Sequence, residues 1–129
     1  MSNASRYWAH WRTTELAQAR SSGHLQQTVV VLPLGATEQH GPHLPLQVDS
    51  AIADAVVAAA VARLDASVSA LFLPTQYVGY SPEHAAFAGT LTLKAETVIR
   101  LWTDIAESVA ASGVRRLVLF NTHGGHVGL

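Results

Sequence analysis

Three short apolar segments, at residues 28–34, 70–74 and 115–121, constrain the fold more than any other feature of this sequence. The first of them, TVVVLPL, is β-branched and continuously apolar, which is typical of a strand buried on both faces of a parallel sheet. Helix-like segments at 51–64 and 93–112 separate the three segments. Strands that alternate with helices predict a mainly parallel sheet with right-handed crossovers, and therefore an α/β fold.

Residues beside the helix-like segments predict where the helices begin and end. Asp49 or Ser50 can cap the first long helix, and Thr92 can cap the second. Gly113 suits the left-handed conformation that ends a helix. A shorter amphipathic helix is expected at 13–22. The first long helix is apolar around most of its circumference, so we expect it to be covered on more than one side.

The composition excludes several classes of protein. The 129 residues are enough for one domain, and 49% of them are hydrophobic while 13% are charged, so the chain is not disordered. The net charge of −1, without long charged runs, indicates neither a nucleic-acid partner nor a membrane partner. Cysteine is absent, which excludes a thiolate metal site. No signal peptide or membrane-spanning run is recognisable, so a cytoplasmic protein is expected.

Polar residues with metal-binding side chains collect after the predicted strands. Five of the seven histidines follow them, namely His40, His43, His84, His123 and His126. The same segments carry Glu38, Asp49, Glu83 and Asn121. Because the carboxyl ends of parallel strands form one edge, where open α/β sheets bind ligands, we expect these side chains to reach a shared cleft.

Imidazoles and carboxylates without thiolates are suitable ligands for zinc, manganese or similar divalent ions. Glu38 and His40 stand two residues apart and can address neighbouring metal positions. Asp49 returns at the end of the same loop, and one carboxylate can bridge two ions. His123 could complete a site from the third strand. Bridged ions of this kind activate a bound water and polarise a carbonyl group.

Simpler interpretations of these residues stay open. Asp49 can be a helix cap and Glu38 a solvated acid, and lone histidines near turns are often solvated or structural. The segment NTHGGHVG can also form a phosphate-binding turn, but it lacks the lysine of a P-loop. A serine hydrolase is disfavoured because no G-x-S-x-G motif exists and Ser81 has no evident base with an orienting partner.

Three motifs, LPLGATEQHGPHLPLQVD, YSPEHAAFAGT and NTHGGH, resemble in order and spacing those of the creatininase (creatinine amidohydrolase) family. The resemblance implies a three-layer α/β/α sandwich around a mainly parallel sheet, usually assembled into hexamers. Members of the family are about twice as long. The resemblance therefore implies that residues 1–129 form a single α/β domain equivalent to the N-terminal half, with the C-terminal half absent.

The shorter length bears on catalysis. The resemblance implies that the residues which complete the family's active site lie beyond Leu129, the last residue of this sequence. No catalytic residue is therefore assigned within the chain, and the site residues that the resemblance implies are metal ligands and the residues around them.

The resemblance also implies a function. It implies a divalent-metal-dependent amidohydrolase, in which a hydroxide bridging two zinc, manganese or iron ions attacks the amide C–N bond of a small molecule or short peptide. Glu38, Asp49 and His123 match the ligands of one ion, and His40 and Asp49 match those of the second. Contacts to the substrate or to these ligands are expected from Ser81, His84, His43 and His126.

Two positions depart from the pattern of creatininase proper. Gly125 stands where creatininase carries a metal-binding glutamate, which argues against creatinine as the substrate. His126 replaces an amide and offers a further ligand or base. Two other functions stay open: a non-catalytic metal-binding or assembly subunit, and a peptidase in the maturation of a peptide-derived cofactor of the mycofactocin type.

Overall fold

The structure is a computed structural model, which describes residues 5–129. Its sheet has the order β2-β1-β3, and the strands are β1 (Val29–Leu34), β2 (Ala70–Phe72) and β3 (Arg116–Asn121). Val29 aligns with both Ala70 and Arg116, and all pairing is parallel, so the three strands end at one edge. The predicted parallel sheet is confirmed. β1 and β3 each begin one residue later than predicted, and β2 ends two residues earlier.

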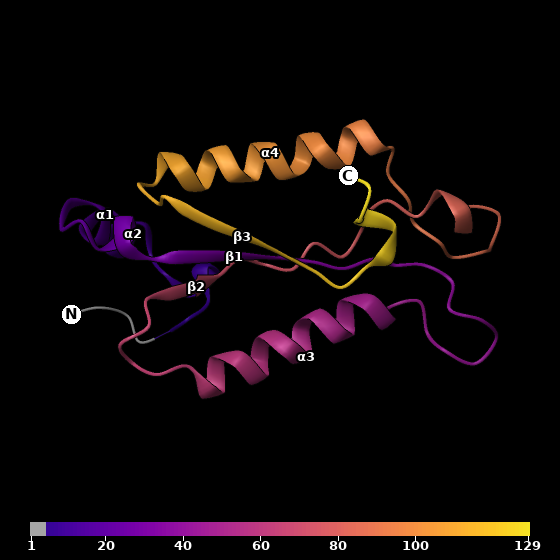
Figure 1. Cartoon of the computed structure of the whole chain (residues 1–129), viewed down its shortest axis with the longest axis horizontal. Coiled ribbons are helices and arrows are strands. Elements are labelled where there is room, and N and C mark those ends of the chain that lie inside the picture. Colours follow the sequence, from indigo (N-terminus) through magenta and orange to yellow (C-terminus); the bar gives the residue numbers. More distant parts are fainter. Residues whose placement is uncertain (1–4) are drawn as a thin grey trace.

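Two long helices connect the strands and lie on either side of the sheet (Figure 1). The first is α3 (Val48–Arg63) between β1 and β2, and the second is α4 (Ala95–Ala111) between β2 and β3. The shorter elements are η1 (Trp8–His10), α1 (Thr13–Ser21), α2 (His24–Gln27), η2 (Pro82–His84) and η3 (Gly124–His126). The helix–sheet–helix layering confirms the α/β sandwich expected from the sequence.

The predicted helix caps are wrong, although the helices themselves are present. Gln47 is the N-cap of α3, so Asp49 and Ser50 lie inside the first turn. Ser50 Oγ instead donates a hydrogen bond of 2.9 Å to the Ala36 carbonyl, and this bond holds the loop after β1 against the helix. Helix starts predicted from sequence are often wrong by a few residues, because several adjacent polar residues can serve as caps.

A second cap was also assigned to the wrong residue. Lys94 is the N-cap of α4, and Thr92 Oγ1 accepts a 2.8 Å hydrogen bond from the Ser81 N–H. Thr92 therefore fixes the loop after β2 instead of the helix. At the other end of α4, Gly113 has a φ of +100°, which confirms the expected left-handed position.

The main core lies between the sheet and α4. Alternate residues of β1, namely Val30, Leu32 and Leu34, are fully buried there and pack in one cluster with Val109 of α4. Burying such side chains contributes about 1.5–3 kcal/mol each to stability. The central strand is therefore held rigidly, and so is the point at which its loop begins.

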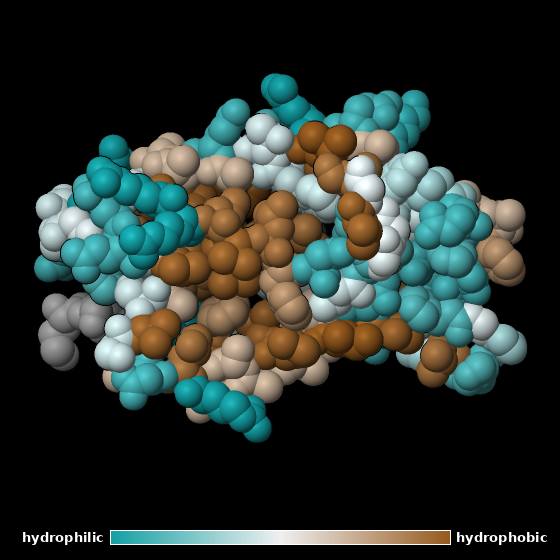
Figure 2. All heavy atoms as spheres, viewed as in Figure 1, coloured by the Kyte–Doolittle hydropathy of each residue, from teal (hydrophilic) through white to brown (hydrophobic). Residues whose placement is uncertain are grey.

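The opposite side of the sheet is less completely covered. Ile52 and Val56 of α3 are about half exposed, and so is Val118 of β3. Figure 2 shows apolar side chains gathered over the sheet and along α3 in the same view. The apolar composition of α3 led us to expect cover on more than one side. The described residues do not provide that cover, so this expectation is wrong for residues 5–129.

Within the described residues, no helix combines the length and apolar character that a membrane crossing requires.

Candidate metal centre

The loops that follow the three strands, at 35–47, 73–94 and 122–129, are joined to one another by hydrogen bonds. The Leu91 N–H donates to the Thr37 carbonyl at 2.9 Å, which joins the first loop to the second. Thr122 Oγ1 donates to the Asp49 carbonyl at 2.8 Å, which joins the third loop to the start of α3. The side chains expected at one edge of the sheet therefore stand on a connected scaffold.

The structure brings together the four residues predicted as metal ligands. His123 Nδ1 lies 2.7 Å from Asp49 Oδ2 and 3.3 Å from Glu38 Oε1. The other oxygen of Asp49, Oδ1, lies 3.2 Å from His40 Nε2. Glu38, Asp49 and His123 are buried and His40 is partly buried. Asp49 thus stands between two imidazoles and presents one carboxylate oxygen to each.

Hydrogen bonds to backbone carbonyls identify the protonated ring nitrogen of His40 and of His123. His40 Nδ1 lies 3.2 Å from the Glu38 carbonyl, and His123 Nε2 lies 2.8 Å from the Tyr80 carbonyl. A carbonyl only accepts hydrogen bonds, so these nitrogens carry protons and the other nitrogen of each ring faces the carboxylates. Metal-binding histidines in proteins almost always donate their second N–H in this way. Tyr80 acts through its backbone, which is why no side-chain pattern pointed to it.

Glu38 provides an independent test of whether a cation fits. Its Oε2 atom is buried and has no hydrogen-bond partner among the described residues. A buried carboxylate oxygen without a partner is costly, and a bound cation removes that cost. Ligand atoms of Glu38, His40 and Asp49 lie within 4.8 Å of one another. This set of donors, with His123 beside it, suits zinc or manganese.

Three of the remaining predicted residues have different surroundings. Ser81 is buried, with its Oγ 3.2 Å from His123 Nε2. The side-chain amide of Gln39 lies 2.8 Å from His84 Nδ1, which leaves His84 Nε2 facing Glu38 Oε2 at 3.8 Å. His43 is exposed and makes no hydrogen bond or ion pair within residues 5–129, so the structure does not bring it into the cluster.

His126 is packed behind the cluster. Its Nε2 accepts a hydrogen bond from the Tyr80 N–H at 3.1 Å, and its Nδ1 therefore donates to Asn121 Oδ1 at 3.0 Å. The ring contacts Trp102 edge-on, with 4.9 Å between centroids. Burial, followed by the neighbouring charge of His123, lowers the pKa of His126 to about 4. Neither nitrogen is free, so His126 is not the additional ligand or base that its position suggested.

Leu129 lies at the end of the same turn and takes no part in the metal cluster. Its N–H donates to the His126 carbonyl at 2.9 Å, and its apolar side chain is partly exposed. A leucine side chain offers neither a metal ligand nor a proton donor, so no chemical role is assigned to Leu129. The expectation that residues beyond Leu129 complete the active site stays a prediction.

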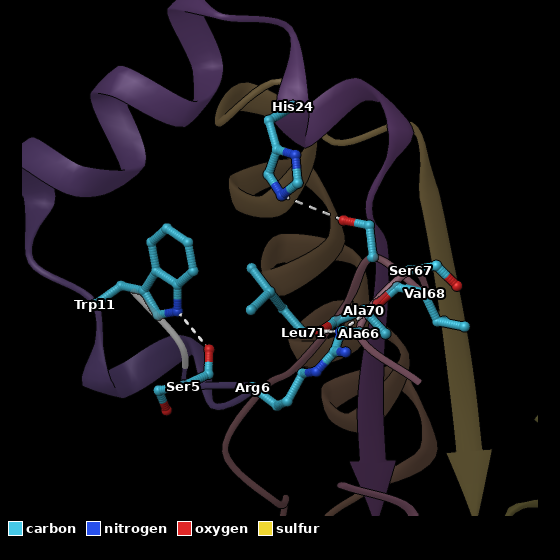
Figure 3. A pocket seen from close by; sticks show the side chains of 10 residues that line it. Ser5, Arg6, Trp11, His24, Ala66, Ser67, Val68, Ala70 and Leu71 are labelled. Carbon is cyan, nitrogen blue, oxygen red and sulfur yellow. Dashed lines mark hydrogen bonds between the residues drawn. The ribbon is translucent and has the colours of Figure 1, made fainter. Parts of the chain in front are cut away.

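A separate hollow of about 340 Å³ lies at the amino end of the sheet (Figure 3). Its polar groups are already engaged with one another. Arg6 donates to the carbonyls of Asp65 and Val68, and His24 Nε2 lies 3.3 Å from Ser69 Oγ. Ligands of open α/β sheets bind at the other edge, so the cluster around Asp49 is the better candidate for a functional site.

Comparison with known proteins agrees with this geometry. The family model named Creatininase, described as creatinine amidohydrolase, matches residues 9–129. The chain belongs to the creatininase family. The resemblance of its three motifs to that family is thereby confirmed.

Individual creatininase-family proteins match over most of this chain. A mycofactocin precursor peptide peptidase from Mycobacterium tuberculosis (strain ATCC 25618 / H37Rv) is 45% identical over 88% of this chain and 48% of its own length. A creatinine amidohydrolase from Pseudomonas putida is 36% identical over 74% of this chain and 37% of its own. The solved structure "Creatininase Mn" aligns with a TM-score of 0.78 and 32% identity, covering 92% of this chain and 46% of that one. The chain thus spans about half the length of the curated relatives it matches.

Proposed function

We propose that this creatininase-family protein is a divalent-metal-dependent hydrolase that cleaves an amide C–N bond. One observation carries the proposal. Glu38, His40, Asp49 and His123 converge from two loops and a helix start, and one buried oxygen of Glu38 has no protein partner among the described residues. A cation is the simplest group that satisfies this arrangement, because three of the four side chains are buried.

The protein's residues can hold two ions. Glu38, Asp49 and His123 would bind one, and His40 and Asp49 the other, with Asp49 shared because its two oxygens face different imidazoles. Zinc, manganese and iron all accept such nitrogen and oxygen ligands. When bound, ions of this kind polarise the substrate carbonyl and make water nucleophilic near neutral pH.

The surrounding residues orient these ligands and offer a hydrogen-bond donor to the substrate. The Tyr80 and Glu38 carbonyls hold the rings of His123 and His40 in the tautomers that leave one nitrogen free. His84 Nε2, which bears a proton because Gln39 donates to Nδ1, stands at the edge of the cluster and is partly exposed. It can donate a hydrogen bond from that N–H to a substrate. The Oδ1 atom of Asn121 accepts a hydrogen bond from the backbone N–H of His123 at 3.1 Å, which orients the backbone of the turn after β3.

A short-peptide amide is the substrate class that we favour. The identity of 45% to a mycofactocin precursor peptide peptidase exceeds the 36% to a creatinine amidohydrolase. Gly125 adds to this preference, because it places no carboxylate beside His123.

A non-catalytic metal-binding subunit is the alternative to a hydrolase. The cytoplasmic location and the hexameric assembly expected from the sequence stay predictions.

The test is hydrolysis by protein stripped with a chelator and reloaded with zinc, manganese or iron. We expect release of a new amine from short peptides that disappears on stripping and returns with metal. Creatinine should be turned over much more slowly. Metal binding without hydrolysis of any amide would support the non-catalytic subunit, and hydrolysis that survives stripping would contradict the mechanism.

A further inference from the structure

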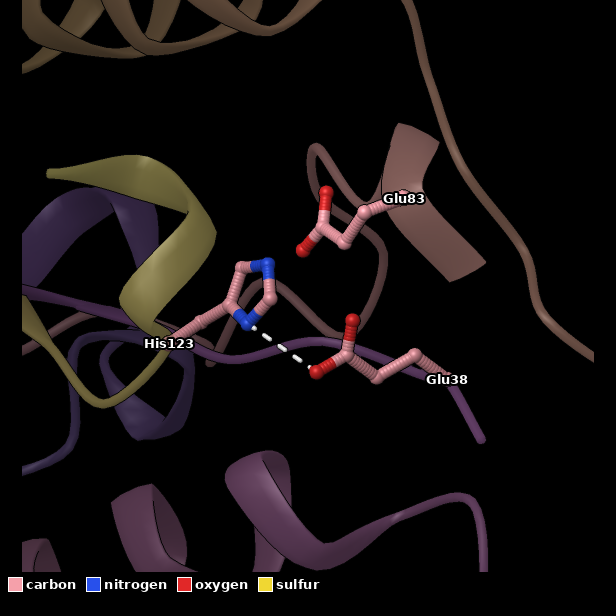
Figure 4. Close-up of side chains that lie close together, drawn as sticks. All are labelled: Glu38, Glu83 and His123. Atoms are coloured by element: carbon pink, nitrogen blue, oxygen red, sulfur yellow. Dashed lines mark ion pairs between the residues drawn. The ribbon is translucent and has the colours of Figure 1, made fainter. Parts of the chain in front are cut away.

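Glu83 lies beside the cluster and comes from a loop that the four predicted ligands do not use. One carboxylate oxygen of Glu38, one of Glu83 and one ring nitrogen of His123 all lie within 4.8 Å of one another. Figure 4 shows the three side chains converging from three segments, with Glu38 after β1, Glu83 on η2 and His123 before η3. The carboxylates of Glu38 and Glu83 both reach toward the His123 ring, and two negative charges this close are unfavourable unless a positive charge lies between them.

A positive charge at this place would satisfy Glu38 Oε2. This oxygen is buried and has no hydrogen-bond partner in residues 5–129, whereas Oε1 already faces His123 at 3.3 Å. The Nε2 atom of His84 is 3.8 Å from this oxygen, which is too long for a hydrogen bond. Glu38 also belongs to the group formed with His40 and Asp49, so it takes part in both candidate ligand sets.

At Gly125, the turn after β3 has no room for a side-chain ligand. A Cβ atom at Gly125 would lie 2.5 Å from His123 Nε2 and 2.6 Å from the Tyr80 carbonyl, distances at which atoms overlap. The loop after β2 approaches the cluster from another direction. The backbone of that loop is fixed where Glu83 begins, because the buried Ser81 bonds to Thr92 and the His84 N–H donates to the Ser81 carbonyl at 3.1 Å.

We propose that Glu83 is a metal ligand, contributed by the loop after β2, that binds the same ion as Glu38 and His123. This inference rests on the proposed metal-dependent function and adds a third loop to the ligand set. The Glu83 side chain is 51% exposed, so it can close over an ion that enters from solvent. Carboxylate ligands at a partly open position are compatible with substrate access to the ion.

A different explanation for the position of Glu83 is an ion pair with His84. The Glu83 Oε1 and His84 Nε2 atoms are 3.7 Å apart, and both side chains have solvent-accessible surface. Such exposed pairs contribute little to stability, with a median of about 0–1 kcal/mol. If this pair were the only role of Glu83, its loss would not change the binding of an ion.

The test measures zinc affinity of the purified, chelator-stripped protein by competition with a chromophoric chelator. Glu83→Gln keeps the shape of the side chain and removes its charge. We expect it to weaken zinc binding by at least about tenfold, the lower limit for loss of a group that supports a metal site. Glu107→Gln is the matched control, because Glu107 is exposed on α4, and it should bind zinc like the parent.

A spectroscopic measurement separates ligation from a general charge effect. Cobalt(II) in place of zinc has an absorption spectrum that depends on its ligands, so Glu83→Gln should change the spectrum while Glu107→Gln should leave it like the parent's. Parental affinity and spectrum in Glu83→Gln would overturn the inference but leave the proposed function intact. A parent protein that binds neither zinc nor cobalt would contradict both.

Discussion

His123 Nδ1 lies 2.7 Å from Asp49 Oδ2, although 74 residues separate them in the sequence. Asp49 stands in the first turn of α3, directly after the loop from β1, and His123 follows β3. β1 and β3 are hydrogen-bonded neighbours that end at the same edge, so the sheet topology brings the pair together. Carboxylates are also favoured near a helix N-terminus, and Asp49 occupies such a position.

The shared position of Asp49 predicts that Asp49→Asn greatly weakens metal binding. Asparagine retains the size of the side chain but not the charge that faces both His40 and His123. Zinc affinity, measured by calorimetry on stripped protein, should fall by more than the roughly 10–100-fold typical of lost supporting groups. His43→Asn is the control and should bind zinc like the parent, because His43 is exposed outside the cluster. Equal affinities in the two variants would show that Asp49 is not a ligand.

Close packing around His123 predicts that Gly125 and Gly124 differ sharply in their tolerance of alanine. A Cβ at Gly125 would overlap His123 Nε2 and the Tyr80 carbonyl, whereas one at Gly124 meets nothing within 4 Å. Gly125→Ala should therefore lower the free energy of unfolding by about 1–3 kcal/mol, as expected for overpacking, and should also weaken zinc binding. Gly124→Ala should change neither quantity. Denaturant titrations of both variants with the parent make the comparison, and equal stabilities would show that the turn relaxes freely.

The sheet and the convergence of ligands followed from the sequence for a physical reason. Continuous apolar strands are typical of buried parallel sheets, and the carboxyl ends of parallel strands lie at one edge. Glu38, His40, Asp49 and His123 could therefore be placed together without coordinates. The start of α3 could not be assigned, because Gln47, Asp49 and Ser50 are all polar and the loop contacts that choose between them are tertiary.

Contacts that depend on exact geometry could not be predicted from the sequence. The role of His126 depends on a backbone N–H from Tyr80 and on the ring of Trp102, both distant in sequence. Neither group produces a recognisable spacing with His126. Glu83 was placed at the correct edge of the sheet, but its closeness to Glu38 depends on how the loop after β2 folds.

The environment of His126 predicts how the stability of the metal-free protein depends on pH. Its folded-state pKa is lowered from 6.5 to about 4, chiefly by burial. Between these values the unfolded chain binds a proton that the folded protein does not, so stability falls as the pH is lowered from about 6.5 to 4. His126→Asn removes this contribution and should make the decline shallower, while His43→Asn should keep the parent's slope. Thermal unfolding across this pH range measures it, and identical slopes in parent and His126→Asn would contradict the assignment.

The exposed apolar surface of β3 predicts self-association of the protein. Val118 and Leu119 are 47% and 49% exposed, and as neighbours in a strand they point to opposite faces of the sheet. Within residues 5–129 no strand pairs with the outer edge of β3, and such an edge favours association. Light scattering coupled to size-exclusion chromatography should therefore show oligomers at micromolar concentration.

Paired substitutions test whether β3 is responsible for that association. Val118→Thr with Leu119→Thr places β-branched threonines, which suit a strand, at both positions while reducing its apolar surface, so the double variant should remain folded and shift toward monomer. Val127→Thr is the control, because Val127 is 82% exposed but lies outside the sheet, and it should associate like the parent. A parent that elutes as a sharp, folded monomer would refute the prediction. Unchanged oligomers in the double variant would instead place the interface on another surface, with exposed Ile52 and Val56 of α3 as the next residues to replace.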